Sequence, residues 1–370
     1  MKRYLYNLAT DQYKGFLAAI LKFFLWTLSL FYGFIVRLLI LLKQRNPHQL
    51  GCKVISVGNI TLGGTGKTVL VEFIAQYLKK QVHQIAILSR GYKRKIQNPC
   101  LSGRQACLPG RQAKSKIQNI ENMGDEPYML KMRLKDIPVI VDKDRTRGAR
   151  CAIDTFHVDT VILDDAFQQW KIARDLNVVT IDATRPFGNR QLLPRGILRE
   201  PLSSLERADI FVLTKTNLTE NTAVIKEELN RLNPDSAVFE SSHEAVGFYD
   251  ANDKERLLSP DSLRSKTVTL FSGIGDPDSF ENLIKVLGLT IGLSYRFSDH
   301  HLYTKQDLNN IFKASRLKNI DTLITTEKDF VRMDHSNWQA QGLRLLVLRI
   351  SLAFKDEQRF YNRLLKLYSV

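Results

Sequence analysis

A glycine-rich segment followed by a lysine and a threonine is the first stretch of this chain whose residue types could do chemistry. Its residues are Thr61, Leu62, Gly63, Gly64, Thr65, Gly66, Lys67 and Thr68. An apolar run at 54–57 precedes it and a helical pattern at 69–79 follows, so the segment joins a buried strand to a helix. Backbone N–H groups of such a loop, with the helix N-terminus, bind phosphate. We therefore predict a nucleotide-phosphate loop in which Lys67 reaches the β- and γ-phosphates and Thr68 binds Mg²⁺.

Two carboxylates stand at the end of another apolar run. Residues 160–163 are followed directly by Asp164 and Asp165. In enzymes with a phosphate loop, an acidic residue at this place orders Mg²⁺ and its waters. The usual loop motif has glycine where this chain has Thr61, but the two acids support the same assignment. Together these residues predict a site for a nucleoside triphosphate and Mg²⁺.

Arginines follow two other predicted strands, at the edge where a doubly wound sheet binds its ligands. Arg90 follows the apolar run 85–88, and Arg145 and Arg147 follow the run 138–141. The second pair of arginines suits either a phosphate clamp or a charged surface, and the sequence leaves both interpretations open.

Asp125 and Glu126 open a helical segment just after a strongly basic stretch. Acids in the first turn of a helix either interact with its dipole or do catalysis, and their spacing does not decide between the two. The preceding residues 93–120 are rich in Lys and Arg and contain no acid. That stretch is either a solvated insertion or a patch that faces an anionic substrate.

Apolar runs alternate with helical patterns over residues 54–232. The alternation predicts an α/β fold of the P-loop NTPase type, with a mainly parallel sheet and helices on both faces. After about residue 240 the pattern begins again without a phosphate loop, and it ends in a helical pattern at 356–368. We therefore expect an N-terminal membrane-associated helix within 1–48, a phosphate-loop domain at 49–240 and a smaller α/β domain at 241–370.

Residues 16–42 form the most apolar stretch of the chain. About 20 such residues can span a bilayer, but a narrow polar stripe favours an amphipathic helix in the membrane interface. The stripe consists of Lys22, Ser29, Gly33 and Arg37. A spanning helix, or one buried against the following domain, are the alternatives. We expect no cleaved signal peptide, and the basic flanks favour the cytoplasmic side for the domain that follows.

The net charge of +16 over 370 residues indicates an anionic partner, which could be a nucleotide, a nucleic acid or an acidic membrane. Nucleic acid is not favoured, because the basic stretch 93–120 lacks interleaved aromatic residues. The four cysteines form no C-x-x-C pair and lack partners at ligand spacing. We therefore expect reduced thiols rather than a metal site.

Seven short motifs give the chain a resemblance to a known family. They are GNITLGGTGKT at 58–68, SRGY at 89–92, GDEP at 124–127, LDDAFQ at 163–168, LLPRGILREP at 192–201, FSDHH at 297–301 and TTEKD at 325–329. In this combination the chain resembles the tetraacyldisaccharide 4′-kinase family of the lipid A pathway over nearly its whole length. The resemblance implies transfer of the γ-phosphate of ATP to the 4′-hydroxyl of tetraacyldisaccharide 1-phosphate. It also implies Mg²⁺ and a location at the cytoplasmic face of the bacterial inner membrane.

The same resemblance implies roles for individual residues. Asp125 would be the general base, His300 its partner from the second domain, and Arg199 the group that stabilises the transferring phosphoryl. The implied metal ligands are Thr68, Asp164, Asp165 and Glu200. Possible contacts to the substrate or its phosphates are Arg90, Glu126, Arg145, Arg147 and Gln168. The family continues D-D-G-F-Q-H, whereas this chain has Ala166 and Gln169 in place of the glycine and the histidine.

A membrane-tethered P-loop ATPase or GTPase switch is the alternative interpretation. Lys215 follows a predicted strand, like the lysine that reads guanine in GTPases. The residue two positions later is Asn217 and not the aspartate of such a motif, and binding of GTP in preference to ATP would distinguish the switch from the lipid kinase.

Overall fold

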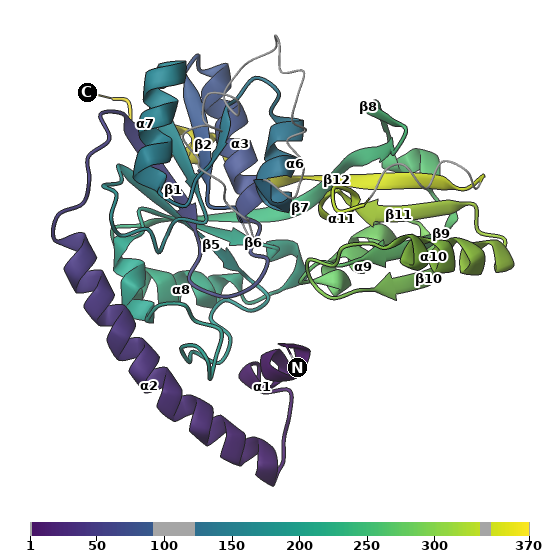
Figure 1. Cartoon of the computed structure of the whole chain (residues 1–370), viewed down its shortest axis with the longest axis horizontal. Helices are drawn as coiled ribbons and strands as arrows, with labels where there is room; N and C mark the ends of the chain where they lie inside the picture. The colour runs from purple at the N-terminus through teal and green to yellow at the C-terminus, as the bar shows by residue number, and fades with distance from the viewer. Residues whose placement is uncertain (1, 92–122, 334–341, 370) are drawn as a thin grey trace.

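The computed structural model describes residues 2–91, 123–333 and 342–369 (Figure 1). Its strands are β1 (Lys53–Gly58), β2 (Ile85–Ser89), β3 (Val139–Val141), β4 (Thr160–Asp164), β5 (Leu176–Asp182), β6 (Ile210–Thr214), β7 (Ala237–Asp250), β8 (Asp253–Leu258), β9 (Thr267–Ser272), β10 (Thr290–Arg296), β11 (Thr322–Thr326) and β12 (Arg344–Phe354). Its α-helices are α1 (Lys2–Ala9), α2 (Phe16–Gln44), α3 (Lys67–Lys80), α6 (Asp125–Arg133), α7 (Arg145–Phe156), α8 (Thr222–Leu232), α9 (Pro277–Val286), α10 (Lys305–Leu317), α11 (Glu327–Phe330) and α12 (Glu357–Leu365). The basic stretch 93–120, with Cys100 and Cys107, lies outside the described residues.

One sheet runs through the described part of the chain, in the strand order β10-β9-β11-β12-β7-β6-β5-β1-β4-β2-β3, with β8 paired to β7. From β3 to β6 all neighbours are parallel. Successive residues of β1 point to opposite faces: Ile55 packs with Leu70 of α3, whereas Val54 packs with Ala149 of α7. The predicted parallel sheet with helices on both faces is therefore confirmed.

Strand β7 belongs to both halves of the sheet. Its first residues pair in parallel with β6, and residues 241–250 pair antiparallel with β12. The smaller α/β unit consists mainly of β9, β10 and β11, which are parallel to one another, and the helices α9 and α10 (Figure 1). The domain boundary expected after residue 240 falls within β7 and stays a prediction.

The last helix returns to the larger unit, which consists of the parallel strands β1 to β6 and the helices that cover them. Phe360 and Leu364 of α12 are fully buried, and they lie in the same apolar cluster as Leu70 and Val71 of α3. The chain therefore completes the core beside the phosphate loop with residues that follow the smaller unit in sequence.

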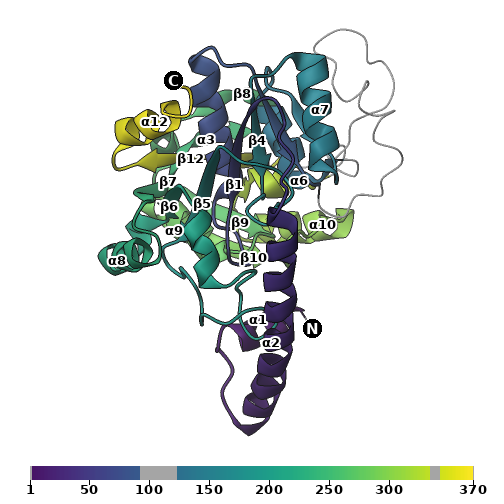
Figure 2. The ribbon, with the colours of Figure 1, turned by 90° about the vertical axis from the view of Figure 1, so that its left-hand side faces the viewer.

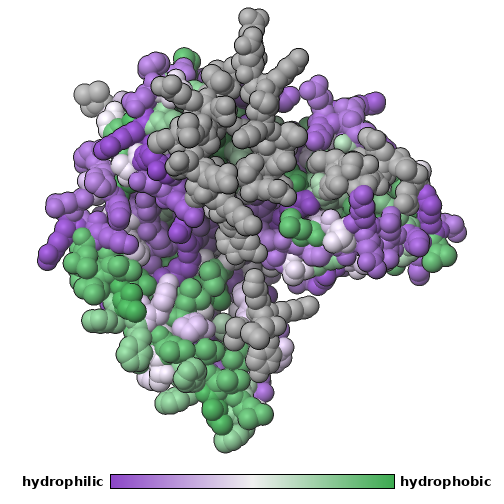
Figure 3. Space-filling view, in the orientation of Figure 1, coloured by the Kyte–Doolittle hydropathy of each residue, from purple (hydrophilic) through white to green (hydrophobic). Residues whose placement is uncertain are grey.

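Helix α2 projects from the larger unit, and by its length and composition it could cross a membrane (Figure 2). Among its buried residues are Ser29 and Gly33 of the predicted polar stripe, whereas Phe31 and Phe34 are 70% and 67% exposed. Lys22 of the same stripe pairs with Asp11 at 2.6 Å. Much of the polar stripe therefore contacts the protein, and the apolar remainder forms a continuous hydrophobic surface (Figure 3).

Candidate active site

The predicted phosphate loop lies between the carboxyl end of β1 and the N-terminus of α3. Helix α3 begins at Lys67, directly after Gly66, whose φ of 81° lies in the left-handed region. A Cβ at Gly66 would approach the Nε2 atom of His243 to 2.9 Å, so both backbone and packing require glycine there. The Thr65 hydroxyl lies 2.8 Å from that of Thr180, which anchors the loop to β5.

Lys67, Asp165 and Arg199 come together beside this loop. The Asp165 Oδ1 atom lies 3.7 Å from the Lys67 Nζ atom and 2.8 Å from the Arg199 Nη1 atom, which also donates to the Asn59 side chain at 3.1 Å. Burial would raise the pKa of Asp165, but the charges of Lys67 and Arg199 lower it to about 2. Three of the predicted residues therefore form one charged cluster.

Asp164 has the opposite environment to its neighbour. It is 1% exposed, its Oδ2 atom accepts a hydrogen bond from the Ser89 hydroxyl at 3.3 Å, and its Oδ1 atom has no partner among the described residues. Burial, with the negative charges of Glu126 and Asp165, raises the pKa of Asp164 to about 7. A buried carboxylate oxygen without a partner is a suitable ligand for a cation.

Mg²⁺ fits the donors at this place. It commonly takes one or two carboxylates and completes its octahedron with waters and substrate phosphates. Asp164 supplies an unpartnered carboxylate oxygen, and Thr68 stands on α3, which contacts β4. Glu200 is fully buried and paired with Arg207 at 2.6 Å, with its Oε1 atom unpartnered within the described residues. Over those residues, no three His, Cys, Asp or Glu side chains gather closely enough to hold an ion by themselves.

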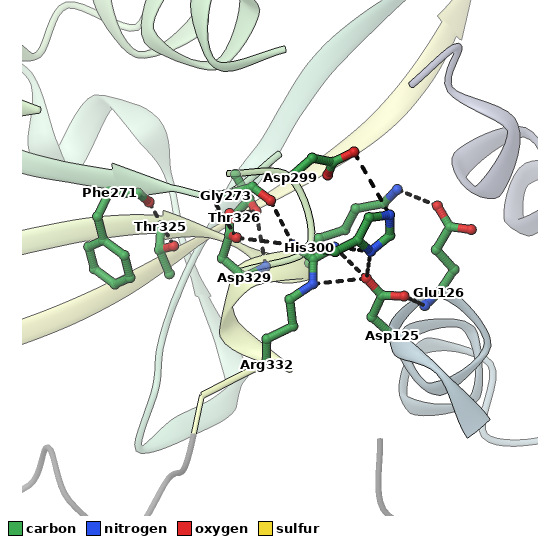
Figure 4. A network of polar contacts seen from close by, with 11 residues as sticks. Asp125, Glu126, Phe271, Gly273, Asp299, His300, Thr325, Thr326, Asp329 and Arg332 are labelled. Atoms are coloured by element: carbon green, nitrogen blue, oxygen red, sulfur yellow. Dashed lines mark hydrogen bonds and ion pairs between the residues drawn. The ribbon is translucent and has the colours of Figure 1, made fainter. Parts of the chain in front are cut away.

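Asp125 lies at the N-terminus of α6 and contacts residues of the smaller unit (Figure 4). Its Oδ2 atom accepts hydrogen bonds from the His300 Nδ1 atom and the Arg332 Nε atom, both at 2.8 Å. Burial would raise the pKa of Asp125, but the bond to His300 and the charge of Arg332 hold it well below the usual range. The same bond to Asp125 raises the pKa of His300 above its ordinary value.

The neighbouring Glu126 makes a second contact between the two units. Its Oε1 atom lies 2.5 Å from the Nζ atom of Lys328. Figure 4 shows Glu126 beside Asp125. The charges of Lys328 and Lys67 lower the pKa of Glu126, and Glu126 in turn raises that of Asp164. A Cβ at Gly275 of the smaller unit would lie 3.9 Å from the Gly64 amide nitrogen and 3.5 Å from the Asp299 Oδ2 atom, which lies 3.8 Å from the His300 Nε2 atom. The Asp125–His300 pair and the phosphate loop therefore lie in one charged site.

Of the other predicted contact residues, Arg145, Arg147 and Gln168 contact neighbouring parts of the protein. Arg145 is 4% exposed and donates to the Leu88 carbonyl and, at 2.8 Å, to the Asp164 carbonyl, so it braces two strand ends. Arg147 binds Asp142 through two hydrogen bonds of 2.8 and 2.7 Å. The Gln168 amide donates to the Asn59 carbonyl at 3.0 Å, and Arg90 is exposed after β2.

Arg332 and Lys328 are two charged residues of this site that we did not predict. Arg332 is 5% exposed and also donates to the Gly273 carbonyl at 2.8 Å. The available signal was the TTEKD motif, since it contains Lys328, and Arg332 follows its last residue, Asp329, by one helical turn.

Comparisons with known proteins identify a family. The model of the family described as tetraacyldisaccharide-1-P 4′-kinase matches residues 21–369. A tetraacyldisaccharide 4′-kinase from Halothermothrix orenii is 34% identical over 373 residues, covering 96% of this chain and 95% of that protein. One from Syntrophobacter fumaroxidans is 39% identical over 288 residues, covering 77% of this chain and 73% of that protein. The crystal structure of LpxK from Aquifex aeolicus in complex with ATP is similar, with a TM-score of 0.70 and 27% identity, covering 94% of this chain and all of that chain.

Proposed function

This chain belongs to the tetraacyldisaccharide-1-P 4′-kinase family, and from that premise we infer that it transfers the γ-phosphate of ATP to the 4′-hydroxyl of tetraacyldisaccharide 1-phosphate. The observation that carries the inference is the meeting of Asp125 and His300, 2.8 Å apart, beside the phosphate loop. A kinase needs both a phosphate-binding loop and a group that aligns the attacking hydroxyl, whereas a nucleotide switch needs only the first. The switch is therefore not favoured.

We assign Asp125 to the attacking hydroxyl. Its low pKa makes it a weak base, but phosphoryl transfer depends mainly on positioning and on stabilisation of charge. The bond from His300 and the two from Arg332 support this role, because they fix the carboxylate in one orientation. The positive charge of Arg332 and the bond from His300 also keep the carboxylate ionised, so that it can accept a hydrogen bond from the attacking hydroxyl.

Lys67 and Arg199 are the cations that we assign to the phosphates, and their shared contact with Asp165 supports this role. We assign Thr68 and Asp164 to Mg²⁺, with Asp165 and Glu200 as further acids of that site. The bound ion would neutralise charge on the phosphate oxygens during transfer. The unpartnered carboxylate oxygen of Asp164 supports this part of the proposal.

We also propose that the chain works at the cytoplasmic face of the bacterial inner membrane, with α2 in the membrane interface. The exposed apolar surface of α2 supports this location, because such a surface is stable only where lipid or another apolar group covers it. An acylated acceptor explains why a nucleotide-binding fold carries such a helix.

A kinase assay with the full chain tests the proposal. Tetraacyldisaccharide 1-phosphate in mixed micelles, with ATP and Mg²⁺, should give a product heavier by one phosphoryl group in mass spectrometry. The Lys67→Met variant is the matched control and should give none. Free turnover of ATP by the unaltered chain without any phosphorylated lipid would show that the assignment is wrong.

A further inference from the structure

Residues Ile197–Arg199 pair with the entrance of the phosphate loop. The Leu62 amide donates to the Ile197 carbonyl at 2.8 Å, and the Arg199 amide donates to the Ile60 carbonyl at 2.7 Å. Thr61 lies opposite Leu198 in this short antiparallel bridge. Movement of this segment therefore moves the backbone that leads into the phosphate loop.

Helix α2 docks on the same segment from its other side. The Tyr32 hydroxyl donates to the Arg199 carbonyl at 2.9 Å. One turn earlier, the Ser29 hydroxyl donates to the Leu192 carbonyl at 2.9 Å and accepts from the Arg195 amide at 3.0 Å. A Cβ at Gly33 would approach the Leu192 side chain to 2.8 Å, so α2 packs closely against the segment that contains Leu192. These residues stand at positions i, i+3 and i+4 and share one face of the helix.

The residue held by Tyr32 is also the residue whose side chain enters the charged cluster. Arg199 binds Asp165 at 2.8 Å, and Asp165 lies 3.7 Å from Lys67. Arg199 is therefore held at its carbonyl by α2, at its amide by the loop entrance and at its guanidinium by the active site. Helix α2 therefore directly contacts Arg199, one of the two residues that we assign to the phosphates.

We propose that Tyr32 is a positioning residue, through which the seating of α2 sets the place of Arg199 and of the entrance to the phosphate loop. The proposal rests on the phosphoryl transfer inferred above, and it goes beyond that function because it gives α2 a part in catalysis as well as in lipid association. A helix correctly seated in the lipid surface holds the Arg199 carbonyl through Tyr32, and a displaced helix releases it.

Tyr32→Phe tests the proposal, because it removes one hydroxyl and leaves the apolar ring in place. We expect kcat to fall about three- to tenfold, the scale of one lost hydrogen bond, with unchanged KM for ATP and unchanged binding to vesicles of phosphatidylglycerol and phosphatidylethanolamine. Tyr6→Phe on α1, where the tyrosine is 38% exposed, is the matched control and should leave all three quantities unchanged.

Hydrogen exchange gives a second readout that does not depend on lipid phosphorylation. The amides of Leu62 and Arg199 should exchange faster in Tyr32→Phe than in the unaltered chain, and Tyr6→Phe should not change them. Unchanged kcat together with unchanged exchange in Tyr32→Phe would overturn the proposal, as would a loss of kcat explained wholly by weaker vesicle binding. An unaltered chain that does not phosphorylate the lipid would instead contradict the proposed function, and the exchange rates would still decide the role of Tyr32.

Discussion

At the scale of single residues, Asp125 is one of the residues through which the larger unit contacts the smaller one. Its carboxylate accepts hydrogen bonds from His300 and Arg332, and the side chain is 9% exposed. These contacts hold the carboxylate ionised and in one orientation, so the role that we propose for Asp125 depends on where its carboxylate is placed.

Asp125→Asn should therefore reduce kcat by about 10²- to 10⁴-fold, the range of a lost acid–base group, while the Kd for ATP changes little. Calorimetric titration with ATP and the lipid kinase assay measure the two quantities separately. Asp154→Asn, at an exposed position of α7, is the control and should behave like the unaltered chain. A loss of ATP affinity as large as the loss of kcat would assign Asp125 to the nucleotide or its metal.

The contact between His300 and Asp125 should make stability depend on pH. The folded pKa of His300 is raised, mainly by Asp125, so the contact stabilises the protein fully below about pH 6.5. This contribution is lost as the pH rises through the folded pKa of His300. The free energy of unfolding, measured in urea, should therefore be higher for the unaltered chain than for His300→Asn. This difference should be larger at pH 5.5 than at pH 8.5.

The same measurement in an Asp125→Asn background isolates the pair. Asp299 and Arg332 also face His300, but both stay in place in that background. The pH dependence should shrink there; an unchanged dependence would mean that another group, and not the pair, is responsible.

The sequence could identify some residues of the site but not all of them. Lys67 and Asp165 occupy places fixed by the local order of strand, loop and helix, so the pattern could indicate that they lie close together, as they do. Arg332 binds Asp125 across 207 positions of the chain, and no local pattern reports a contact of that kind. Arg145 carries a charge that suited a phosphate, but only the fold shows that it binds strand carbonyls.

At the scale of elements, Arg133 ties three helices and a strand together. It pairs with Glu72 of α3 and with Glu327 of α11, and it donates to the Ile350 carbonyl at 3.3 Å in β12. All three charged side chains are at most 9% exposed. The helix that begins with Asp125 is thus fixed at its other end by a buried charge cluster.

Arg133→Met should lower the free energy of unfolding by about 3–5 kcal/mol, because it leaves two buried carboxylates without their cation. Denaturation in urea, or the shift of Tm, measures the loss. Arg231→Met is the matched control: Arg231 pairs with Glu227 at 3.6 Å with both side chains 71% exposed, and its loss should cost less than about 1 kcal/mol. Equal losses of unfolding free energy in the two variants would show that the buried cluster stabilises the fold no more than an exposed ion pair does.

Among the elements, the sequence predicted best those strands and helices that have a regular pattern of apolar residues. The parallel strands from β1 to β6 are short buried runs between helical patterns, and they were found. Strand β7 was not, because Glu240, Ser241 and His243 interrupt its apolar pattern where it passes from one half of the sheet to the other. For α2 the periodicity located the polar stripe, but only the fold shows that Ser29 and Gly33 face the protein.

At the scale of the whole molecule, charge and hydrophobicity are separated in space. The apolar surface gathers over α2, and the rest of the face in Figure 3 is largely hydrophilic among the residues drawn in colour. An acceptor that presents its sugar hydroxyl from a bilayer would therefore meet the active site from the side of α2.

Replacing Phe31 and Phe34 together by serine should weaken binding to phospholipid vesicles about tenfold or more, because two exposed rings are lost from the lipid-facing surface. The Kd for ATP should not change. Vesicle co-sedimentation and calorimetric titration measure the two effects. Val286 and Leu317, which are 80% and 87% exposed in the smaller unit, give a control pair whose replacement by serine should leave vesicle binding intact. A control pair as damaging as the α2 pair would contradict the assignment of the lipid-facing surface to α2.

The return of α12 to the core of the larger unit bears on how the protein is assembled during translation. A ribosome adds residues in order, and domains usually fold as they emerge. Here Phe360 and Leu364 are made long after the strands and helices that they cover, so the nucleotide-binding unit lacks part of its core while the smaller unit is being synthesised. Ser29 likewise precedes its docking partner Leu192 by 163 positions. The helix with the apolar surface is thus synthesised before the segment on which it docks, and the core beside the phosphate loop is complete only after α12 has been made.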